Sequence, residues 1–252
     1  MTPKKEWLEQ LEKYKEKIAC PVDLNTYFEL PEIAGRKLEV IDIGKCDLPS
    51  GNVFVYDPFM YLGEESPSFF LTVPCGTYRV EICVIKPKEI YECARYAAVR
   101  LRFSDNRPIH FYEALTEKEQ LDTLEQTTNA TFFGCSVDCG MACILDKEVH
   151  LTFCNWLKQW KKEHPNANIV EDYFASLLEE SYKMHPEFQR SFGDWLNWNI
   201  PDTEYHVPIF TSGFGDGYYP VYWGFDKNGE ICQLVIHFID IAQTFEEDAE
   251  EL

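Results

Sequence analysis

The sequence predicts an α+β fold: a largely antiparallel sheet or sandwich with an N-terminal helix, a helical insertion and a closing C-terminal β-hairpin. Strand-like runs with short turns between them recur through residues 37–147, which is typical of antiparallel sheets rather than of alternating β-α units. Apolar residues at helical spacing follow in 148–200. Residues 213–240 then combine a glycine-rich turn, an aromatic run and a second apolar run, which predicts a hairpin.

These observations divide one domain of 252 residues into four parts. They are an N-terminal helix at 1–20, the sheet at 37–147, the insertion at 148–200 and the closing strands at 201–245. Internal repeats and low-complexity linkers, which would argue for several domains, do not occur in the sequence.

The N-terminal helix has a start signal, one apolar face and a stop signal. Thr2 is a predicted N-cap, with Pro3 at the first helical position and Pro21 ending the helix. The apolar face has spacings of four, three and four residues, made by Trp7, Leu11, Tyr14 and Ile18. Mixed Glu and Lys on the other face favour docking on the protein body over membrane binding.

The sheet region contains several runs that alternate apolar and polar residues. We expect two short strands around Gly44, and a short helix from the capping-box pattern at Thr116 through Gln126. The other expected strands are Asn52–Asp57, Phe69–Val73, Thr77–Ile85, Tyr96–Phe103 and Met141–Leu145.

The insertion is predicted to hold three helices. Val149, Phe153, Trp156 and Trp160 lie on one face of the first, and Val170, Tyr173, Phe174, Leu177 and Leu178 mark the second. A third, shorter helix is expected to hold Phe188, Phe192 and Trp195. Pro201 returns the chain to extended structure, and Tyr205–Thr211 leads into the glycine-rich turn.

The closing hairpin begins with the turn Gly213–Gly217, whose three glycines permit positive φ. Tyr218–Phe225 forms its first strand, and Asp226–Gly229 is the turn before the return strand Glu230–Asp240. Because Pro220 cannot donate to a ladder, we expect the first strand to lie at an edge or to be bulged there.

Charge and cysteine content restrict the function classes. The 23 basic and 43 acidic residues give a net charge of −20, which argues against nucleic-acid binding and is compatible with a basic partner, divalent cations or simple solubility. The absence of a long apolar run or an export signal predicts a cytoplasmic protein with no membrane span. Ten cysteines in a chain of this length then indicate reduced, buried thiols rather than a disulfide scaffold.

Three glycine-flanked or strand-end acids are candidate binding residues: Asp138, Asp146 and Asp216. Carboxylates at strand ends can converge on Mg²⁺ or Mn²⁺, or one can act as a general base. The alternative is that each carboxylate accepts hydrogen bonds from the amides of its own turn.

Aromatic and sulfur-containing residues give further candidates. Tyr219, Tyr222 and Trp223 could present a surface to a partner or could pack in the core. His237, in an apolar strand, is either a hydrogen-bonded core residue or an assisting base. The spacing of Cys135, Cys139 and Cys143 differs from zinc-binding pairs, so buried thiols are favoured over metal ligands.

Four motifs together resemble the uncharacterised bacterial domain-of-unknown-function family DUF4241. They are Ser50-Gly51 leading to Tyr56-Asp57-Pro58, the run 73–80, Val137–Gly140 with Asp146, and Gly215–Gly224. The resemblance covers about residues 40–240, and implies fold kinship and a bacterial origin but no reaction. The family tends to have an acid where this chain has His237.

Three functions are therefore open. The first is an acidic binding protein, for example of immunity or regulatory type, that captures a basic protein and needs no cofactor. The second is a hydrolase in which Asp138, Asp146 and Asp216 hold Mg²⁺ or Mn²⁺ and His237 assists. The third is a small-ligand sensor with a pocket between the sheet and the helices of 148–198. The sequence indicates neither a particular ligand nor an oligomeric state.

Overall fold

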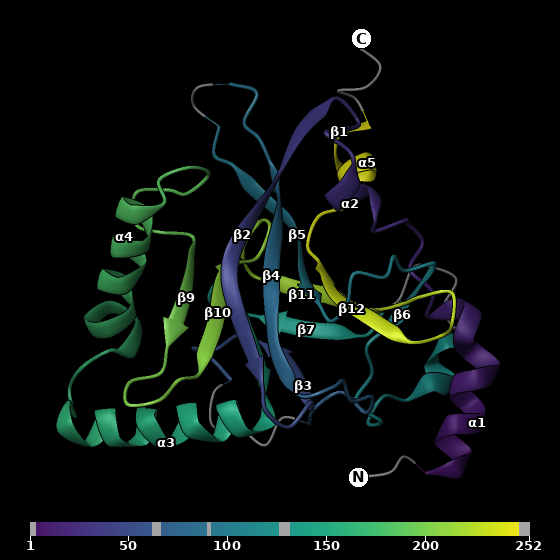
Figure 1. Cartoon of the computed structure of the whole chain (residues 1–252), viewed down its shortest axis with the longest axis horizontal. Helices are drawn as coiled ribbons and strands as arrows, with labels where there is room; N and C mark the ends of the chain where they lie inside the picture. The colour runs from purple at the N-terminus through teal and green to yellow at the C-terminus, as the bar shows by residue number, and fades with distance from the viewer. Residues whose placement is uncertain (1–3, 62–66, 90–91, 126–131, 247–252) are drawn as a thin grey trace.

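The computed structural model describes residues 4–61, 67–89, 92–125 and 132–246 and shows a mixed α+β fold (Figure 1). Two antiparallel sheets pack against each other, and helices cover the smaller one. The strands are β1 (Glu32–Ile33), β2 (Arg36–Leu48), β3 (Val53–Tyr56), β4 (Gly76–Ile85), β5 (Arg95–Arg102), β6 (His110–Glu113), β7 (Gly134–Val137), β8 (Met141–Asp146), β9 (Trp195–Asn199), β10 (His206–Thr211), β11 (Gly217–Phe225) and β12 (Ile231–His237). The helices are α1 (Lys5–Tyr14), α2 (Thr26–Glu29), α3 (Lys147–Glu163), α4 (Ala175–Met184) and α5 (Ile241–Thr244), with 3₁₀ turns at Lys15–Lys17 and Leu121–Glu125 and a π-turn at Val170–Phe174.

The larger sheet has the order β1-β2-β4-β5-β12-β11-β6. β7 also pairs with β11, at Gly217–Pro220, whereas β6 pairs with it at Tyr222–Phe225. The predicted closing hairpin, β11 and β12, lies inside the sheet between β6 and β5, with Val221 opposite Ile236 and Trp223 opposite Leu234. β5 flanks the hairpin on the other side, with Val99 opposite Ile236. Strands β4, β5, β11 and β12 are therefore buried along most of their length, and the main hydrophobic core forms around them.

The smaller sheet, in the order β3-β8-β10-β9, shares the main core on its inner face. Its outer face packs on α3 and α4, as the amphipathic patterns of the first two insertion helices predict. Phe153 of α3 and Phe174 of the π-turn are fully buried against Trp198, with ring centroids 4.6 and 4.9 Å from it. Burial of such aromatic surface stabilises a fold by roughly 25 cal/mol per Å², so these contacts fix the insertion on the sheet.

α1 lies apart from the insertion, on the far side of the larger sheet (Figure 1). Its predicted apolar face packs on the 3₁₀ turn at Leu121–Glu125, with Tyr14 and Ile18 buried. The helix begins at Lys5 and gives way to a 3₁₀ turn at Lys15, several residues before Pro21; the predicted cap at Thr2 and Pro3 lies outside the described residues. No helix in the part of the chain that the structure describes is both long and apolar enough to cross a membrane.

Two predictions about strands near the N-terminus were wrong. The two short strands around Gly44 are one 13-residue strand, β2, because Gly44 takes a φ of +108° and absorbs a bulge without ending the pairing. Phe69–Val73 forms no strand: the chain bends at Phe70 and Leu71, and only an isolated bridge joins Thr72 to Asn52.

Three further predictions were wrong. The third insertion helix is absent: Phe188 and Phe192 lie in a loop, and Trp195 begins β9, which pairs with β10. β11 is an interior strand whose bulge lies at Gly224/Phe225, not at Pro220. Pro220 is tolerated because pairing with β12 starts at Val221, so no ladder bond is lost on that side.

The short helix expected from Thr116 is only the 3₁₀ turn at Leu121–Glu125, and Gln126 lies outside the described residues.

Candidate functional site

The glycine-rich turn between β10 and β11 is held by its own hydrogen bonds. Ser212 donates its hydroxyl to the carbonyl of Gly215 at 2.7 Å, and the same carbonyl accepts from the hydroxyl of Tyr219 at 2.7 Å. Gly213 and Gly215 have φ values of +43° and +108°, a range that residues with a Cβ atom rarely adopt. The turn therefore holds Phe214 between two glycines, with 58% of its surface exposed.

A second turn, Val137–Gly140, is organised by the buried carboxylate of Asp57. Its Oδ2 accepts from the backbone N–H groups of Asp138 and Cys139 at 2.9 and 2.8 Å, and its Oδ1 accepts from the Cys139 thiol at 2.9 Å. Oδ1 also accepts from the amides of Phe59 and Met60. Asp57 is fully buried, so this one carboxylate joins two turns that lie about 80 residues apart in sequence.

The two turns meet. The amide of Ser212 donates to the carbonyl of Gly140 at 3.1 Å, and a Cβ on Gly140 would lie 3.8 Å from the Cα of Gly215. Asp138 and Asp216 thus come from neighbouring turns, and both are exposed; Asp138 accepts a hydrogen bond from Tyr61.

Asp146 does not join them. It ends β8 at the opposite end from the 138–140 turn, is fully buried, and caps α3 by accepting from the amide of Glu148 at 2.7 Å. Its carboxylate also accepts from the amide and hydroxyl of Ser50 at about 3 Å. No three His, Cys, Asp or Glu side chains within the described ranges are grouped as a metal site requires, so the geometry gives the three-aspartate arrangement no support.

Beneath the two turns lies a cavity of about 320 Å³, which we call the cleft. It lies between the sheets and the insertion, and the insertion contributes Val170, Leu178, Phe192 and Gly193 to its lining. The remaining lining residues are Phe59, Arg95, Cys139, Gly140, Met141, Arg190, Thr211, Ser212, Gly213, Phe214 and Gly215. A mainly apolar hollow with a few polar groups is the usual form of a small-molecule site.

The two arginines of the cleft differ in how their charge is balanced. Arg190 is paired: its Nε lies 2.7 Å from Oδ1 of Asp194, a carboxylate whose side chain is only 5% exposed. Arg95, the first residue of β5, has no carboxylate partner among the described residues; its guanidinium lies 5.4 Å from the ring centre of Phe214. Arg95 therefore brings an unbalanced positive charge to the cleft wall.

Cys139 is a further titratable group in the lining of the cleft. Burial, and then its hydrogen bond to the Asp57 carboxylate, raise the pKa of the Cys139 thiol well above its ordinary value. A thiol held protonated in this way is a poor nucleophile. Cys135 and Cys143 are buried, and all ten cysteines are free thiols, so the described site offers thiol packing rather than thiolate ligation.

The aromatic candidates are part of the main hydrophobic core. Tyr219, Tyr222 and Trp223 are 9%, 3% and 0% exposed, so an exposed ribbon from Tyr219 to Trp223 does not form. His237 is also buried, with Nε2 2.9 Å from the hydroxyl of Tyr27, and burial lowers its pKa to about 4. These four residues do not line the cleft.

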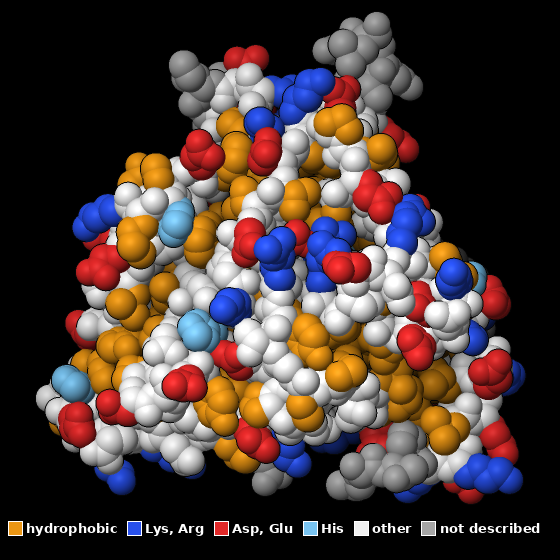
Figure 2. Space-filling view, in the orientation of Figure 1, with side chains coloured by type: hydrophobic (Ala, Val, Ile, Leu, Met, Phe, Trp, Pro, Cys, Tyr) orange, Lys and Arg blue, Asp and Glu red, His pale blue; other side chains and the backbone are white. Residues whose placement is uncertain are grey.

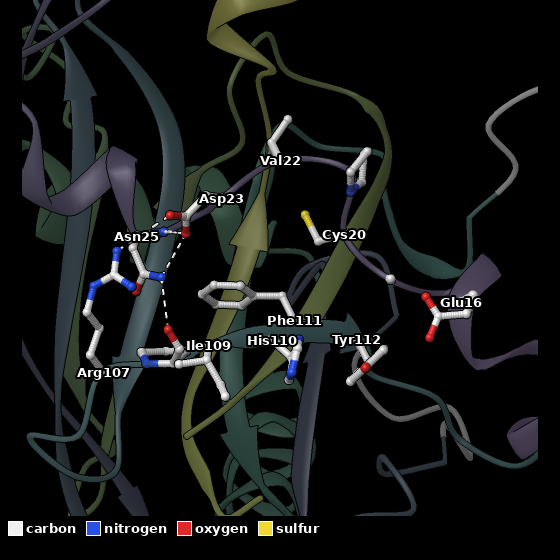
Figure 3. A pocket seen from close by; sticks show the side chains of 13 residues that line it. Glu16, Cys20, Val22, Asp23, Asn25, Arg107, Ile109, His110, Phe111 and Tyr112 are labelled. Atoms are coloured by element: carbon white, nitrogen blue, oxygen red, sulfur yellow. Dashed lines mark hydrogen bonds and ion pairs between the residues drawn. The ribbon is translucent and has the colours of Figure 1, made fainter. Parts of the chain in front are cut away.

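A second cavity, of about 350 Å³, lies where residues 16–25 cross β6 (Figure 3). Asp23, Asn25 and Arg107 gather at one end of it, with Asn25 bonded to Asp23 at 2.7 Å and to the carbonyl of Pro108 at 3.1 Å. Arg107 is satisfied by Glu29 at 2.9 Å and Asp23 at 3.5 Å. Because Arg107 is paired within the protein, we interpret this cavity as a junction between the segment that follows α1 and the sheet.

The sequence between residues 46 and 236 matches the family described as Protein of unknown function (DUF4241). The chain belongs to the DUF4241 family. No curated protein and no solved structure was found to match it.

The DUF4241 match contains every residue that lines the cleft. It leaves out residues 16–25, which form one wall of the cavity in Figure 3. The cleft is thus built wholly from the segment that defines DUF4241 membership, and the second cavity depends on a segment outside that match.

Sequence reasoning missed Asp57, Arg95 and a pair formed by Asp47 and His206. His206 donates its backbone amide to Asp47 Oδ2 at 2.7 Å, and its Nδ1 lies 2.9 Å from the same oxygen, in an open groove of about 770 Å³. Burial raises the pKa of Asp47, but hydrogen bonds from Thr77 and His206 outweigh it and leave that pKa lowered. The Asp57-Pro58 dipeptide was a usable signal for a structured carboxylate, whereas nothing local distinguishes Arg95 or Asp47.

Proposed function

We propose that the protein binds a small anionic molecule in the cleft, as a ligand sensor or carrier rather than as a hydrolase. The unbalanced charge of Arg95 is the observation that carries this proposal. The chain has 43 acidic and only 23 basic residues, so carboxylate partners are abundant, yet Arg95 pairs with none among the described residues. A guanidinium with five donors beside an apolar hollow favours a carboxylate or phosphate there.

The surrounding groups agree with binding rather than with chemistry. Cys139 is kept protonated, and Arg190 is committed to Asp194. The base-like pair of Asp47 and His206 lines a different groove. The cleft therefore has a charge to orient a ligand and apolar walls to hold it, without a paired nucleophile and base.

The experiment is a calorimetric titration with a panel of small carboxylates and phosphates, comparing wild type with Arg95→Gln. A charge-assisted hydrogen bond contributes about 1.5–3 kcal/mol, so we expect at least about a tenfold loss of affinity. Arg79→Gln is the matched control: it removes the same charge from an exposed residue that pairs with Asp42 outside the cleft. Silence of the wild type towards the whole panel, or equal losses in both variants, would overturn the proposal.

Capture of a basic protein is a second proposal, favoured by the net charge of −20. Figure 2 shows acidic and basic side chains interspersed on the visible face, so steering by a single acidic field would have to come from elsewhere. Pull-downs at low and high salt test it: a stoichiometric basic partner released by salt supports it, and no partner at low salt contradicts it.

A further inference from the structure

Two exposed phenylalanines stand at the cleft. Of the 18 phenylalanines in the chain, Phe192 and Phe214 are the ones exposed in the described residues, at 55% and 58%. Phe192 comes from the loop after α4 and Phe214 from the glycine-rich turn, and both line the same cavity. Apolar side chains gathered around a hollow and left in water are typical of a ligand site.

Each of these rings is already stacked on one side by an arginine. The guanidinium of Arg190 lies 4.6 Å from the ring centre of Phe192, and that of Arg95 lies 5.4 Å from the ring centre of Phe214. Asp194 fixes Arg190, and the cation–π contact then orients Phe192. Each phenylalanine nevertheless keeps more than half of its surface exposed.

The backbone holds both rings in place before any ligand arrives. Gly193, next to Phe192, has a φ of +86°, and a Cβ there would lie 2.2 Å from the carbonyl oxygen of Leu178. Gly213 and Gly215 flank Phe214 with positive φ, and a Cβ on Gly213 would lie 2.9 Å from Phe238. These positive-φ conformations, which glycine adopts readily, determine where the backbone places the two rings at the cleft.

We propose, building on the anion-binding function above, that the ligand is a flat ring bearing an acidic group. The ring stacks on Phe192 and Phe214, and the acid binds Arg95. A cavity of about 320 Å³ is at the small end of ligand pockets, which suits one ring system and its acidic substituent. Two sources share this chemistry: an aromatic carboxylate and a nucleoside monophosphate.

Matched ligand pairs test the ring separately from the charge. We would titrate AMP against ribose 5-phosphate and phenylacetate against acetate, because each pair keeps the acid and changes the ring. We expect one ring-bearing ligand to bind at least tenfold more tightly than its ringless counterpart. Tight AMP binding identifies the nucleotide source, and tight phenylacetate binding identifies the aromatic acid.

Variants then assign the effect to the two rings. Phe192→Ala and Phe214→Ala should each weaken the ring-bearing ligand severalfold or more and leave the ringless one unchanged. Leu151→Ala, a similarly exposed apolar residue on α3 outside the cleft, should change neither. If affinities are equal within both pairs and Arg95→Gln still weakens binding, the proposal of ring stacking is wrong and the proposal of anion binding stands. If none of the four ligands binds, both proposals are wrong.

Discussion

Cys139 donates both its backbone N–H and its thiol to the carboxylate of Asp57, at 2.8 and 2.9 Å. The same carboxylate accepts three more backbone amides, two from its own turn and one from Asp138. Since Asp57 is fully buried, its charge is stabilised by these donors alone. The contact fixes the 137–140 turn, on which the glycine-rich turn and the cleft then rest.

Asp57→Asn should therefore lower the free energy of unfolding by roughly 3 kcal/mol. The amide group of asparagine would face N–H donors at one of the two oxygen positions and leave buried donors unsatisfied, each at a cost of about 1–3 kcal/mol. Urea denaturation measures the change. Asp105→Asn is the control, because that side chain is fully solvated and its pair with Arg102 contributes little. A loss below about 1 kcal/mol for Asp57→Asn would contradict the role assigned here.

The closing hairpin shows what the sequence can predict. The turn Asp226–Gly229, with Gly229 at a φ of +78°, and the apolar runs on either side determine β11 and β12 locally. The first two insertion helices were predictable for the same reason, since one face of each is apolar at helical spacing.

Features that depend on distant contacts could not be predicted. Phe188 to Trp195 has helical spacing, but pairing of Trp195 with Phe210 makes β9 instead. The glycines of the Val137–Gly140 and Gly213–Gly217 turns are evident in the sequence, but the contact between Asp57 and the first turn depends on the pairing of β3 with β8. Arg95 is distinguished by having no carboxylate partner among the described residues, and no local sequence pattern encodes such a lack.

Among the three aspartates first considered, we expect Asp146 to matter for stability and Asp216 not to. Asp146→Ala removes an N-cap and leaves the amide and hydroxyl of Ser50 without their acceptor, which should cost roughly 2 kcal/mol. Asp216→Ala, at an exposed turn position, should change stability by less than about 0.5 kcal/mol. Thermal and urea unfolding of both variants test this, and equal effects would show that the cap assignment is wrong.

Glu113 should make the protein less stable as the pH rises from about 4.5 to about 8. Burial raises its pKa to about 8, against the opposing effect of a hydrogen bond from the amide of Phe133. The folded state therefore binds this proton more tightly than the unfolded state, so the stabilisation is complete below pH 4.5 and is lost towards pH 8. Glu113→Gln should flatten this slope, with each unit of pKa difference worth roughly 1.4 kcal/mol. Urea titrations at pH 5 and pH 8 measure it; parallel pH dependence in both proteins would refute it.

Buried His237 should make the protein less stable as the pH falls from 6.5 towards 4. Burial lowers its pKa from 6.5 to about 4, although Asp240 and a backbone hydrogen bond favour the charged form. The unfolded chain binds the proton first, so stability is complete above pH 6.5 and falls as the pH drops towards 4. His237→Gln should remove this loss, so the stability difference between wild type and variant should shrink or reverse between pH 7 and pH 4.5.

Tyr27→Phe separates the titration of His237 from its hydrogen bond. That variant removes the hydroxyl that contacts Nε2 at 2.9 Å but leaves the imidazole buried, so it should lower stability at every pH and keep the slope. A His237→Gln profile that runs parallel to wild type would show that His237 is not the source of the acid sensitivity.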